Sequence, residues 1–525
     1  MSKSYTRKEV AQHSTDGDCW IVIDKRVFDV SKFAKFHPGG KWVLLTAAGK
    51  DATEQFYALH RAEVLHKYMD KLCIGAVEGE GAEVLELALT APEPGTISEV
   101  PYAESNFWEG FTSRYYDESH LKLRAHVRKF FDTELPLTTA AALDEAGEEP
   151  SQELYEKMGQ AGFLAARIGP GVHMMLPGVA PPNGIPPEKF TYFHEMIVHE
   201  EITRLGVPGF CDGLGAGLVI GLPPVIRFAK NKELARKVGM EVLLGKKRIC
   251  LAITDPGAGS DVANISATAV KTPCGKFYIV NGVKKWITNG SFCDYFTTAV
   301  RTGGPGMGGI SMLLIERGPG LTTTKIKTSY SAAAGTAYVF YDNVKVPVEN
   351  LLGEENKGFR CIMDNFNHER WMIVVGVNRG SRLLVEECFK WANQRKVFGK
   401  NLLAQPVIRA KLANMIAQTE AVHHWTENVT LQMCTMSHAD QALKLAGPIA
   451  LLKLQSTRVS QFVMDEACQI FGGRAITRTG MGQVVERFQR ATKFGAILGG
   501  SEEIMADLGV RQAMKRFPKV ASARL

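Results

Sequence analysis

Two histidines near the start of the chain have a spacing that suits a metal-binding pair. His37 lies in the sequence HPGG, where Pro38 fixes one backbone dihedral and two glycines let the chain turn close to a flat ligand. His60 follows 23 residues later, and about two short helices fit in between. Two imidazoles can bind an iron from opposite faces only if the intervening chain wraps around the edge of a planar macrocycle. Either histidine alone is more often a turn or surface residue, so only the pair supports this interpretation.

Two short loops in the middle of the chain have a composition that suits a bound flat ring. Residues 251–261, LAITDPGAGSD, place small residues and backbone amides around a Thr and a Ser, so the chain can approach a ligand closely. Residues 285–290, KWITNG, offer a Trp that could cover a ring and a Thr that could donate a hydrogen bond. A tight turn and a hairpin turn are the alternative interpretations of these two loops.

Residues 6–76 resemble the cytochrome b5 family, and the resemblance is carried by the run DCWIVIDKRVFDVSKFAKFHPGGKWVLLTAAGKDATEQFYALHR. It implies a b-type haem whose iron has His37 and His60 as axial ligands. We take His60 rather than His66 because it ends the DATEQF pattern at the family's spacing, although Arg61 stands where members often have Ser. With both axial positions filled, the iron has no open site, and one-electron transfer is the chemistry that remains.

Six motifs further along the chain resemble the acyl-CoA dehydrogenase family in order and spacing, over almost all of residues 106–516. They are the two loops above, DNVKVPVENLLGEENKGF (342–359), HERWMIVVGVNRG (368–380), QRKVFGK (394–400) and QIFGG (469–473). The resemblance implies an N-terminal helical bundle, a middle β-barrel-like domain and a C-terminal four-helix bundle. It also implies FAD held at a subunit interface, and hence a homodimer or homotetramer.

The same resemblance implies which residues contact the cofactor and the substrate. Trp286 would cover the isoalloxazine ring and Thr288 would hydrogen-bond near its N5. The other residues assigned to FAD are Ile253, Thr254, Gly259, Ser260 and Ser501, with Arg395, Phe398, Gln469 and Gly473 supplied by the neighbouring subunit. Those assigned to the acyl-CoA are Ser260, Arg370 and Gly499. Asp255 departs from the family, whose members usually have Glu at that position.

The family's reaction needs a base that removes a proton next to the thioester carbonyl while flavin N5 accepts hydride from the following carbon. Many members carry this base in a C-terminal Tyr-Glu-Gly-Thr pattern, but residues 498–501 here are Leu-Gly-Gly-Ser. A smaller branch has Glu directly before a helix Arg, which Glu369-Arg370 matches. We therefore predict Glu369 as the catalytic base, with a pKa raised by burial. A helix ion pair is the alternative role for Glu369, and Glu502 and Glu503 are the competing candidates for the base.

The apolar spacing agrees with these resemblances, because residues 106–245 and 356 onward have helical periodicity and residues 246–350 contain short β-type runs. The expected fold class is a multidomain chain in which an α+β cytochrome b5-like domain precedes the acyl-CoA dehydrogenase fold. The predicted segments are 1–77 (haem domain), 78–105 (linker), 106–245 (helical domain), 246–355 (β domain), 356–520 (helical bundle) and 521–525 (tail). The glycine-rich run at 209–226 could leave room for an acyl chain.

The composition excludes several classes of protein. The 525 residues, of which 45% are hydrophobic and 22% charged, predict about three globular units and exclude a disordered or fibrous chain. The net charge of +7 is spread along the chain and does not indicate nucleic acid, and no apolar run predicts an integral membrane segment. The ten cysteines form no CxxC pair and favour a reduced compartment. Ala523-Arg524-Leu525 resembles a peroxisomal address, with the mitochondrial matrix or cytoplasm as alternatives.

We expect the chain to oxidise a fatty acyl-CoA to the trans-2-enoyl-CoA, as in fatty acid β-oxidation. The fused haem would exchange electrons with the flavin, because tethering raises the effective concentration of the two partners. The electron acceptor stays open between a flavoprotein, a haem partner and oxygen, and with oxygen the activity would be that of an acyl-CoA oxidase. A non-catalytic protein that binds acyl-CoA or transfers electrons is the alternative from another class. The acyl length does not follow from the sequence.

Overall fold

The computed structural model describes residues 3–80 and 93–517, which divide into two compact units. The N-terminal unit contains the described residues up to Glu93, together with Glu387–Leu412 and Cys468–Glu486. The larger unit contains Pro94–Glu386, Ala413–Ala467 and the described residues from Arg487 onward. The predicted address at 523–525 and the middle of the predicted linker, 81–92, lie outside the described residues.

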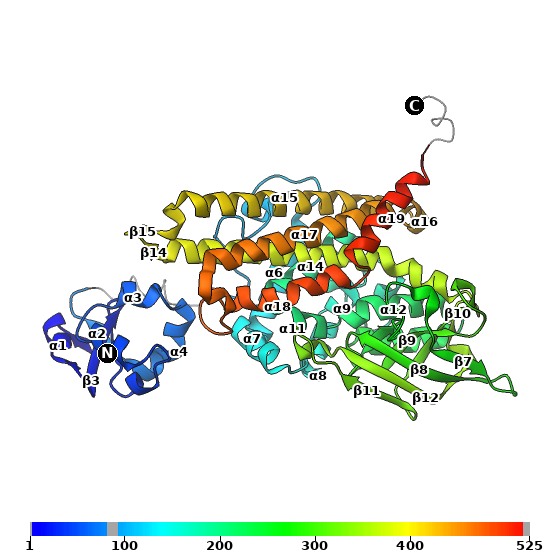
Figure 1. Cartoon of the computed structure of the whole chain (residues 1–525), viewed down its shortest axis with the longest axis horizontal. Helices are drawn as coiled ribbons and strands as arrows, with labels where there is room; N and C mark the ends of the chain where they lie inside the picture. Colours follow the sequence, from blue (N-terminus) through cyan, green and yellow to red (C-terminus); the bar gives the residue numbers. More distant parts are fainter. Residues whose placement is uncertain (1–2, 81–92, 518–525) are drawn as a thin grey trace. The chain divides into compact units, whose positions relative to one another are not determined.

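The N-terminal unit is built on a five-stranded sheet in the order β1-β5-β4-β3-β2 (Figure 1, blue). Its elements are β1 (Ser4–Tyr5), α1 (Arg7–Gln12), β2 (Ser14–Thr15), β3 (Asp18–Ile23), β4 (Arg26–Asp29), α2 (Lys41–Ala47), α3 (Thr53–Tyr57), α4 (Ala62–Leu72) and β5 (Cys73–Val77). Asp24 and Lys25 join β3 to β4, and both have positive φ, as a two-residue hairpin turn requires. A short hairpin, β14 (Lys396–Val397) and β15 (Lys400–Asn401), belongs to the same unit.

The larger unit begins with helices, as the periodicity predicts. They are α6 (Glu118–Glu134), α7 (Leu137–Ala146), α8 (Gln152–Gln160), α9 (Phe163–Ala166), α10 (Tyr192–Arg204), α11 (Pro208–Gly213), α12 (Ala216–Phe228) and α13 (Lys232–Leu243). Side-chain caps fix three of the helix starts, because Asp117, Ser151 and Asn231 each accept a hydrogen bond from a first-turn amide. α10 is the central helix of this group, and its buried residues lie on most of its circumference.

Eight strands follow and form one mixed sheet in the order β11-β12-β8-β7-β9-β10-β13, with β6 paired to β9. They are β6 (Ile249–Ala252), β7 (Thr268–Lys271), β8 (Phe277–Ile287), β9 (Tyr295–Arg301), β10 (Ile310–Glu316), β11 (Leu321–Lys325), β12 (Ala337–Pro347) and β13 (Leu351–Leu352). β6 runs parallel to β9, with Ile249 opposite Tyr295, so the first predicted ligand loop leaves the sheet at the carboxyl end of β6.

Four glycines at a spacing of four residues bring α11 and α12 close to their neighbours. A Cβ on Gly217 would lie 2.5 Å from the Ile249 carbonyl oxygen, and one on Gly221 would lie 2.7 Å from the Cys250 carbonyl group. Added Cβ atoms on Gly209 and Gly213 would meet Ser331 and Ala333 at 2.4 and 2.5 Å. These glycines therefore serve close packing and do not leave room for an acyl chain. Residues 208–228 are apolar enough to cross a membrane, but 78% of their most apolar window is buried in the fold.

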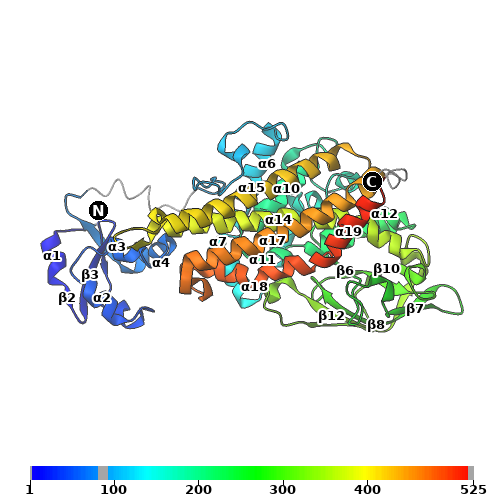
Figure 2. The same cartoon turned by 45° about the horizontal axis from the view of Figure 1, so that its top comes forward.

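The chain ends in helices, of which the longest, α14, α15 and α17, lie side by side in Figures 1 and 2. They are α14 (Gly358–Gln394), α15 (Pro406–Thr435), α16 (His438–Lys444), α17 (Ala446–Phe471), α18 (Gln483–Ile497) and α19 (Glu502–Met514). Trp371 on α14 is fully buried and donates its indole N–H to the Thr430 hydroxyl on α15 at 2.8 Å. The expected order of an N-terminal α+β unit, helices, sheet and long C-terminal helices is thus confirmed.

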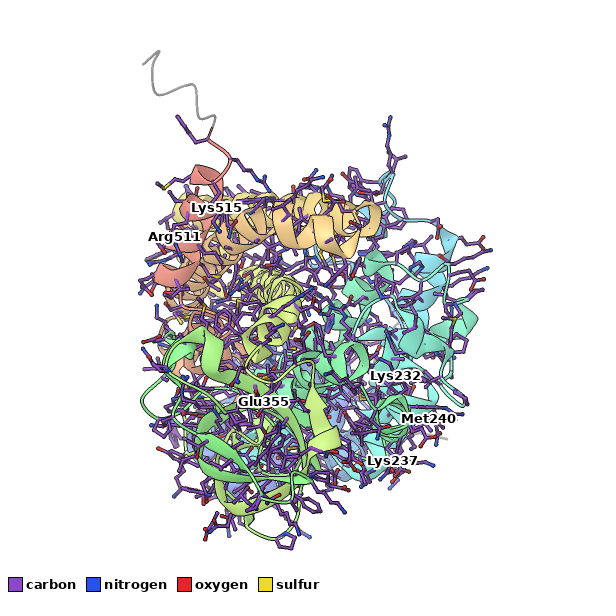
Figure 3. All side chains as sticks on the ribbon, turned by 90° about the vertical axis from the view of Figure 1, so that its right-hand side faces the viewer. Lys232, Lys237, Met240, Glu355, Arg511 and Lys515 are labelled. Carbon is purple, nitrogen blue, oxygen red and sulfur yellow. The ribbon has the colours of Figure 1, made fainter. Side chains whose placement is uncertain are left out.

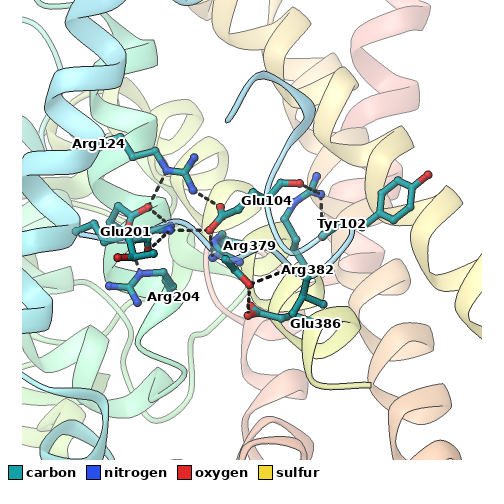
Figure 4. A network of polar contacts seen from close by, with 12 residues as sticks. Tyr102, Glu104, Arg124, Glu201, Arg204, Arg379, Arg382 and Glu386 are labelled. Carbon is teal, nitrogen blue, oxygen red and sulfur yellow. Dashed lines mark hydrogen bonds and ion pairs between the residues drawn. The ribbon is translucent and has the colours of Figure 1, made fainter. Parts of the chain in front are cut away.

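A buried network of charges joins the segment before α6 to α6, α10 and α14 (Figure 4). Glu201 accepts from Arg128 at 2.7 Å and from Arg124 at 3.0 Å, and Glu104 pairs with Arg128 at 2.8 Å and with Arg124. Burial would raise the pKa of Glu104, but Arg124, Arg379 and Arg128 lower that pKa to about 2. Glu104 lies at the end of the predicted linker, so this part of the linker is packed into the larger unit.

We expect Glu201→Gln to lower the free energy of unfolding by about 3–5 kcal/mol, because it leaves buried guanidinium groups without their shared carboxylate. Urea unfolding followed by helical circular dichroism measures the change. Glu118→Gln is the matched control, since its pair with Lys122 has side chains that are 77% and 65% exposed and should contribute at most about 0.5 kcal/mol. Equal midpoints for the two variants would show that the network contributes no stability.

Candidate functional site

A cavity of about 890 Å³ lies in the larger unit, within the size range of cofactor and substrate sites. Its walls come from α10, α11 and α12, the ends of β6 and β8, the first half of α14, and α18 and α19. Ten of the residues predicted from the sequence line it: Ile253, Thr254, Gly259, Ser260, Trp286, Thr288, Glu369, Arg370, Gly499 and Ser501. The structure therefore brings together residues that are up to 248 positions apart in the chain.

Hydrogen bonds connect the two predicted ligand loops. The Lys285 amide donates to the Thr254 carbonyl at 2.9 Å, and the Lys284 ammonium donates to the Ile253 carbonyl at 2.7 Å. An added Cβ on Gly259 would meet no atom within 4 Å, so the space beside this loop is open. The first loop thus has an open face toward the cavity and is fixed from behind by β8.

Asp255, which departs from the usual Glu, has a structural role behind the first loop. Its carboxylate pairs with Lys284 at 2.5 Å and also accepts the Ala267 amide at 2.9 Å. Burial opposes ionisation of Asp255, but Lys284 and the amides of Ser266 and Ala267 hold its pKa below the usual value. Burial lowers the pKa of Lys284 to about 8 despite this partner. The Asp255 side chain, which is shorter than the usual Glu, therefore holds the loop and does not line the cavity.

Trp286 has a backbone conformation that presents its ring to the cavity. Its φ is +64°, which is rare for a bulky residue, and the pairing of β8 with β12 is irregular in this region. The side chain is 52% exposed and lines the cavity together with Thr288. Thr336 also lines it, with a buried hydroxyl that has no partner among the described residues. An exposed aromatic face beside hydroxyl groups fits a flat, polar ring system such as the isoalloxazine of FAD.

Glu369 is a buried carboxylate on the cavity wall. The side chain is 8% exposed, and its Oε2 has no hydrogen-bond partner among the described residues. Burial raises its pKa, while Arg370, Lys453 and His368 act in the opposite direction. The preceding residue faces elsewhere, because His368 Nε2 lies 2.7 Å from Oε1 of Glu195 on α10. Glu369 thus has the burial and the free oxygen expected of a general base.

The turn between α18 and α19 leaves space for Glu369. Gly499 and Gly500 have φ of +64° and +108°, and an added Cβ on Gly499 would lie 3.5 Å from Glu369 Oε1 and 2.7 Å from Ile373 Cδ1. Two buried cations hold this turn: Arg370 Nε donates to the Gly499 carbonyl at 3.0 Å, and Lys453 Nζ donates to the Gly500 carbonyl at 2.6 Å. A side chain at 499 would therefore clash with Ile373 and would contact the Glu369 carboxylate.

The competing acids have other partners or positions. Glu502 is buried and accepts hydrogen bonds from Thr457 at 2.9 Å and Gln461 at 2.8 Å, and it pairs with Arg458. Glu503 is exposed in the first turn of α19. Neither side chain lines the cavity, in contrast to Glu369.

Four predicted cofactor residues, Arg395, Phe398, Gln469 and Gly473, belong to the N-terminal unit and do not line this cavity. Phe398 is 94% exposed, with a φ of +50°. Their assignment to a neighbouring subunit stays a prediction.

Several cavity residues have no motif in the sequence. Arg167 lines the cavity from just after α9, His199 from α10 and Asp212 from α11. Lys453 on α17 supports the Gly499–Gly500 turn from behind. None of the four forms a recognisable ligand-binding pattern with its neighbours in the sequence, so only their presence among buried positions could have indicated them. Arg511 lines the cavity from α19, where Figure 3 shows it one turn before Lys515.

The two predicted iron ligands lie together in the N-terminal unit, with ring centroids 5.9 Å apart. His37 Nδ1 lies 3.1 Å from the Gly40 carbonyl oxygen and His60 Nδ1 lies 3.1 Å from that of Phe56. A carbonyl only accepts, so each Nδ1 carries a proton and each Nε2 keeps a lone pair for a metal. Burial, and then His37, lowers the pKa of His60, which favours the neutral ligand form. His66, the alternative, has a side chain outside the described part.

The surroundings of these imidazoles fit a large apolar ring. Gly39 is needed there, because an added Cβ would lie 2.8 Å from the His37 ring. Val43 and Leu59 are 44% and 42% exposed, and the Phe56 ring stacks on the His60 ring with centroids 4.7 Å apart. In residues 3–80 and 93–517 no three His, Cys, Asp or Glu side chains form a metal cluster. A haem, which supplies four ligands itself, fits a site with two imidazoles.

Comparisons with known families assign almost the whole chain. Residues 6–78 match the cytochrome b5-like heme/steroid binding domain. Residues 117–238, 250–344 and 356–514 match the N-terminal, middle and C-terminal domains of acyl-CoA dehydrogenase.

Relatives and solved structures agree with these matches. The acyl-CoA dehydrogenase apdG of Emericella nidulans is 39% identical over 438 residues, which cover 82% of this chain and 99% of the relative. The acyl-CoA dehydrogenase AFT10-1 of Alternaria alternata is 38% identical, over 81% of this chain and 98% of the relative. An acyl-CoA dehydrogenase structure from Geobacillus kaustophilus has a TM-score of 0.67 at 28% identity, covering 77% of this chain and all of that one. One from Bacillus anthracis, complexed with FAD, has a TM-score of 0.67 at 25% identity, covering 80% and 72%.

The cavity lined by the predicted flavin and substrate residues, the paired imidazoles and these comparisons lead to one assignment. The chain belongs to the acyl-CoA dehydrogenase family of FAD-dependent oxidoreductases, and it carries a cytochrome b5-like haem-binding domain at residues 6–78.

Proposed function

We propose that this protein oxidises a fatty acyl-CoA to the trans-2-enoyl-CoA, with Glu369 as the base. The observation that carries this proposal is the position of Glu369, a buried carboxylate with a free oxygen on the wall of the cavity that the predicted flavin residues line. Bound FAD supplies the acceptor for the hydride that leaves the β-carbon. Glu369 takes the proton from the α-carbon, so one carbon–carbon double bond forms as two carbon–hydrogen bonds break.

The residues around Glu369 support proton removal. A carboxylate that is shielded from water is a stronger base toward a carbon acid, and the covering acyl chain would shield it further. Arg370 and Lys453 fix the Gly499–Gly500 turn through its carbonyls, and thereby the place where the thioester would lie. We propose that the Gly499 amide donates to the thioester oxygen as negative charge develops there. Arg511, exposed at the cavity and paired with Asp507 at 2.6 Å, could meet a phosphate of CoA.

We further propose that the haem domain exchanges electrons with the flavin of the same protein. Support comes from the covalent connection, which raises the effective concentration of one redox centre near the other. With two imidazole ligands the iron would serve electron transfer and not oxygen activation. Fatty acid β-oxidation is the process that this reaction would serve.

Glu369→Gln should lower kcat by about 10²–10⁴-fold, because the amide keeps the shape of the carboxylate and cannot accept the proton. The rate of loss of flavin absorbance after acyl-CoA is added without oxygen measures this. Glu503→Gln, an exposed change near the same site, should leave the rate unchanged. Full activity of Glu369→Gln would show that Glu369 is not the base. If the wild-type protein binds acyl-CoA but its flavin does not bleach, a non-catalytic role is supported.

The pH profile should report the raised pKa of Glu369. Only the carboxylate form accepts a proton, so kcat/KM should fall as the pH drops through this pKa, above the ordinary value of about 4.3. Lys453→Met removes a positive charge that favours the carboxylate, so the acid limb should move to higher pH. Initial rates between pH 5 and 9 give the acid limb of the wild-type protein and that of Lys453→Met. An unchanged limb in Lys453→Met would contradict the electrostatic coupling.

His60→Ala and His37→Ala should each abolish the b-type haem spectrum, because each removes one axial ligand. The flavin spectrum and its bleaching by acyl-CoA should persist in both variants, since the ligands lie in the other unit. In the wild-type protein without oxygen, bleaching of the flavin should be followed by the reduced-haem bands. If the haem bands stay oxidised, internal electron transfer is contradicted, while the proposed dehydrogenase activity is not affected.

A further inference from the structure

One wall of the cavity is polar and charged although it is almost inaccessible to water. Arg167, just after α9, and His199 on α10 are each 3% exposed, and both line the cavity. Asp212 on α11 lines it as well. An unsubstituted alkyl chain would gain nothing from such a wall, because the buried polar groups would lose hydration without finding partners.

Arg167 is the group on this wall with unused hydrogen-bonding capacity. Its Nη1 donates to the Leu214 carbonyl at 2.6 Å. Its Nε is buried and has no hydrogen-bond partner among the described residues. Gly215 makes room for the guanidinium, since an added Cβ would lie 3.1 Å from Nη1 and φ is +120°. Burial lowers the pKa of Arg167, and Tyr155, Asp212 and Glu195 partly offset this effect.

The two nearby carboxylates have other donors. Asp212 accepts the hydroxyl proton of Tyr330. Glu195 Oε1 lies 2.7 Å from His368 Nε2 and 3.2 Å from His199 Nε2. Burial raises the pKa of Asp212 to about 6, so it is mostly ionised at neutral pH. The negative charges of Asp212 and Glu195 therefore balance Arg167 at a distance while leaving its Nε without an acceptor.

The charged wall is distinct from the base. The charged groups that act on Glu369 are Arg370, Lys453 and His368, and Arg167 is not among them. His368 and Glu369 also face different sides of α14, because His368 contacts Glu195 and Glu369 contacts the Gly499 turn. Arg167 and Glu369 therefore line different parts of the same cavity.

We propose that Arg167 binds a neutral oxygen carried by the acyl chain away from the thioester, so that the enzyme favours oxo- and hydroxyacyl-CoAs over unsubstituted alkyl acyl-CoAs of equal length. This inference rests on the proposed dehydrogenase function. A ketone or hydroxyl oxygen would accept the unused N–H of Arg167. A distal carboxylate is disfavoured, because Asp212 and Glu195 already supply negative charge near the guanidinium.

The test compares matched acyl-CoAs on the FAD-loaded full chain: hexanoyl-, 5-oxohexanoyl-, 5-hydroxyhexanoyl- and adipyl-CoA, and the same set with a ten-carbon chain. The kcat/KM for flavin bleaching without oxygen should be at least about 10-fold higher for an oxo or hydroxy compound than for its alkyl partner in one of the two sets. Calorimetric titration with the corresponding enoyl-CoAs should give the same order of binding constants. A preference for the alkyl or the ω-carboxyl compounds in both sets would overturn the proposal.

Arg167→Met should reduce the preference for oxygenated chains to below about 2-fold while leaving kcat/KM for the alkyl compounds within about 3-fold. Arg236→Met, the same change at an exposed position on α13, should leave the preference intact. If Arg167→Met lowers kcat/KM equally for all substrates, Arg167 serves only to hold the Leu214 carbonyl, and the proposal is overturned. If Arg167→Met does not fold, Arg167→Lys, which keeps the charge but lacks Nε, should still lower the preference. Absence of bleaching with every acyl-CoA would instead reject the dehydrogenase function itself.

Discussion

The site depends on the absence of a side chain at residue 499, which lies beside Glu369 although the two are far apart in the sequence. Residue 499 has no side chain, and the space that one would occupy adjoins the carboxylate of Glu369 and the tip of Ile373. The positive φ of Gly499 and Gly500 allows the sharp turn that α18 and α19 need, and it turns both carbonyls toward Arg370 and Lys453. The geometry of the turn, the cations behind it and the position of the acid are therefore one arrangement, in which a change to one part disturbs the others.

Buried ion pairs fix the frame around that arrangement. Asp255 and Lys284 are almost inaccessible to water, and their contact holds the loop after β6 to the end of β8. On the other side, Glu104 and Glu201 bind the arginines of α6 and α14. Such pairs contribute little net stability compared with apolar packing, but they are intolerant of misplacement, because an unpaired buried charge is costly. In this structure, the buried ion pairs lie where loops must keep a defined position.

The sequence predicted the parts of this structure that depend on local patterns. The loops at 253–260 and 285–288, the acid at 369 and the paired histidines all lie in recognisable motifs, and the structure places each group in one site. Arg167, Asp212 and Lys453 were missed, because a charge within an apolar helix has no local mark that distinguishes a cavity wall from a solvent face. The end of the predicted linker was misjudged for a similar reason. A composition rich in Gly, Pro and Glu does not reveal that Glu104 has buried arginines as partners.

The glycine row of α11 and α12 limits how the substrate range of this protein can change. One side of these helices touches the backbone of β6 and the 331–333 segment so closely that almost any substitution at 209, 213, 217 or 221 would push the elements apart. Ala216 and Ile220, one position before two of these glycines, line the cavity instead. On α11 and α12, a change toward longer or shorter acyl groups is therefore limited to the positions that line the cavity.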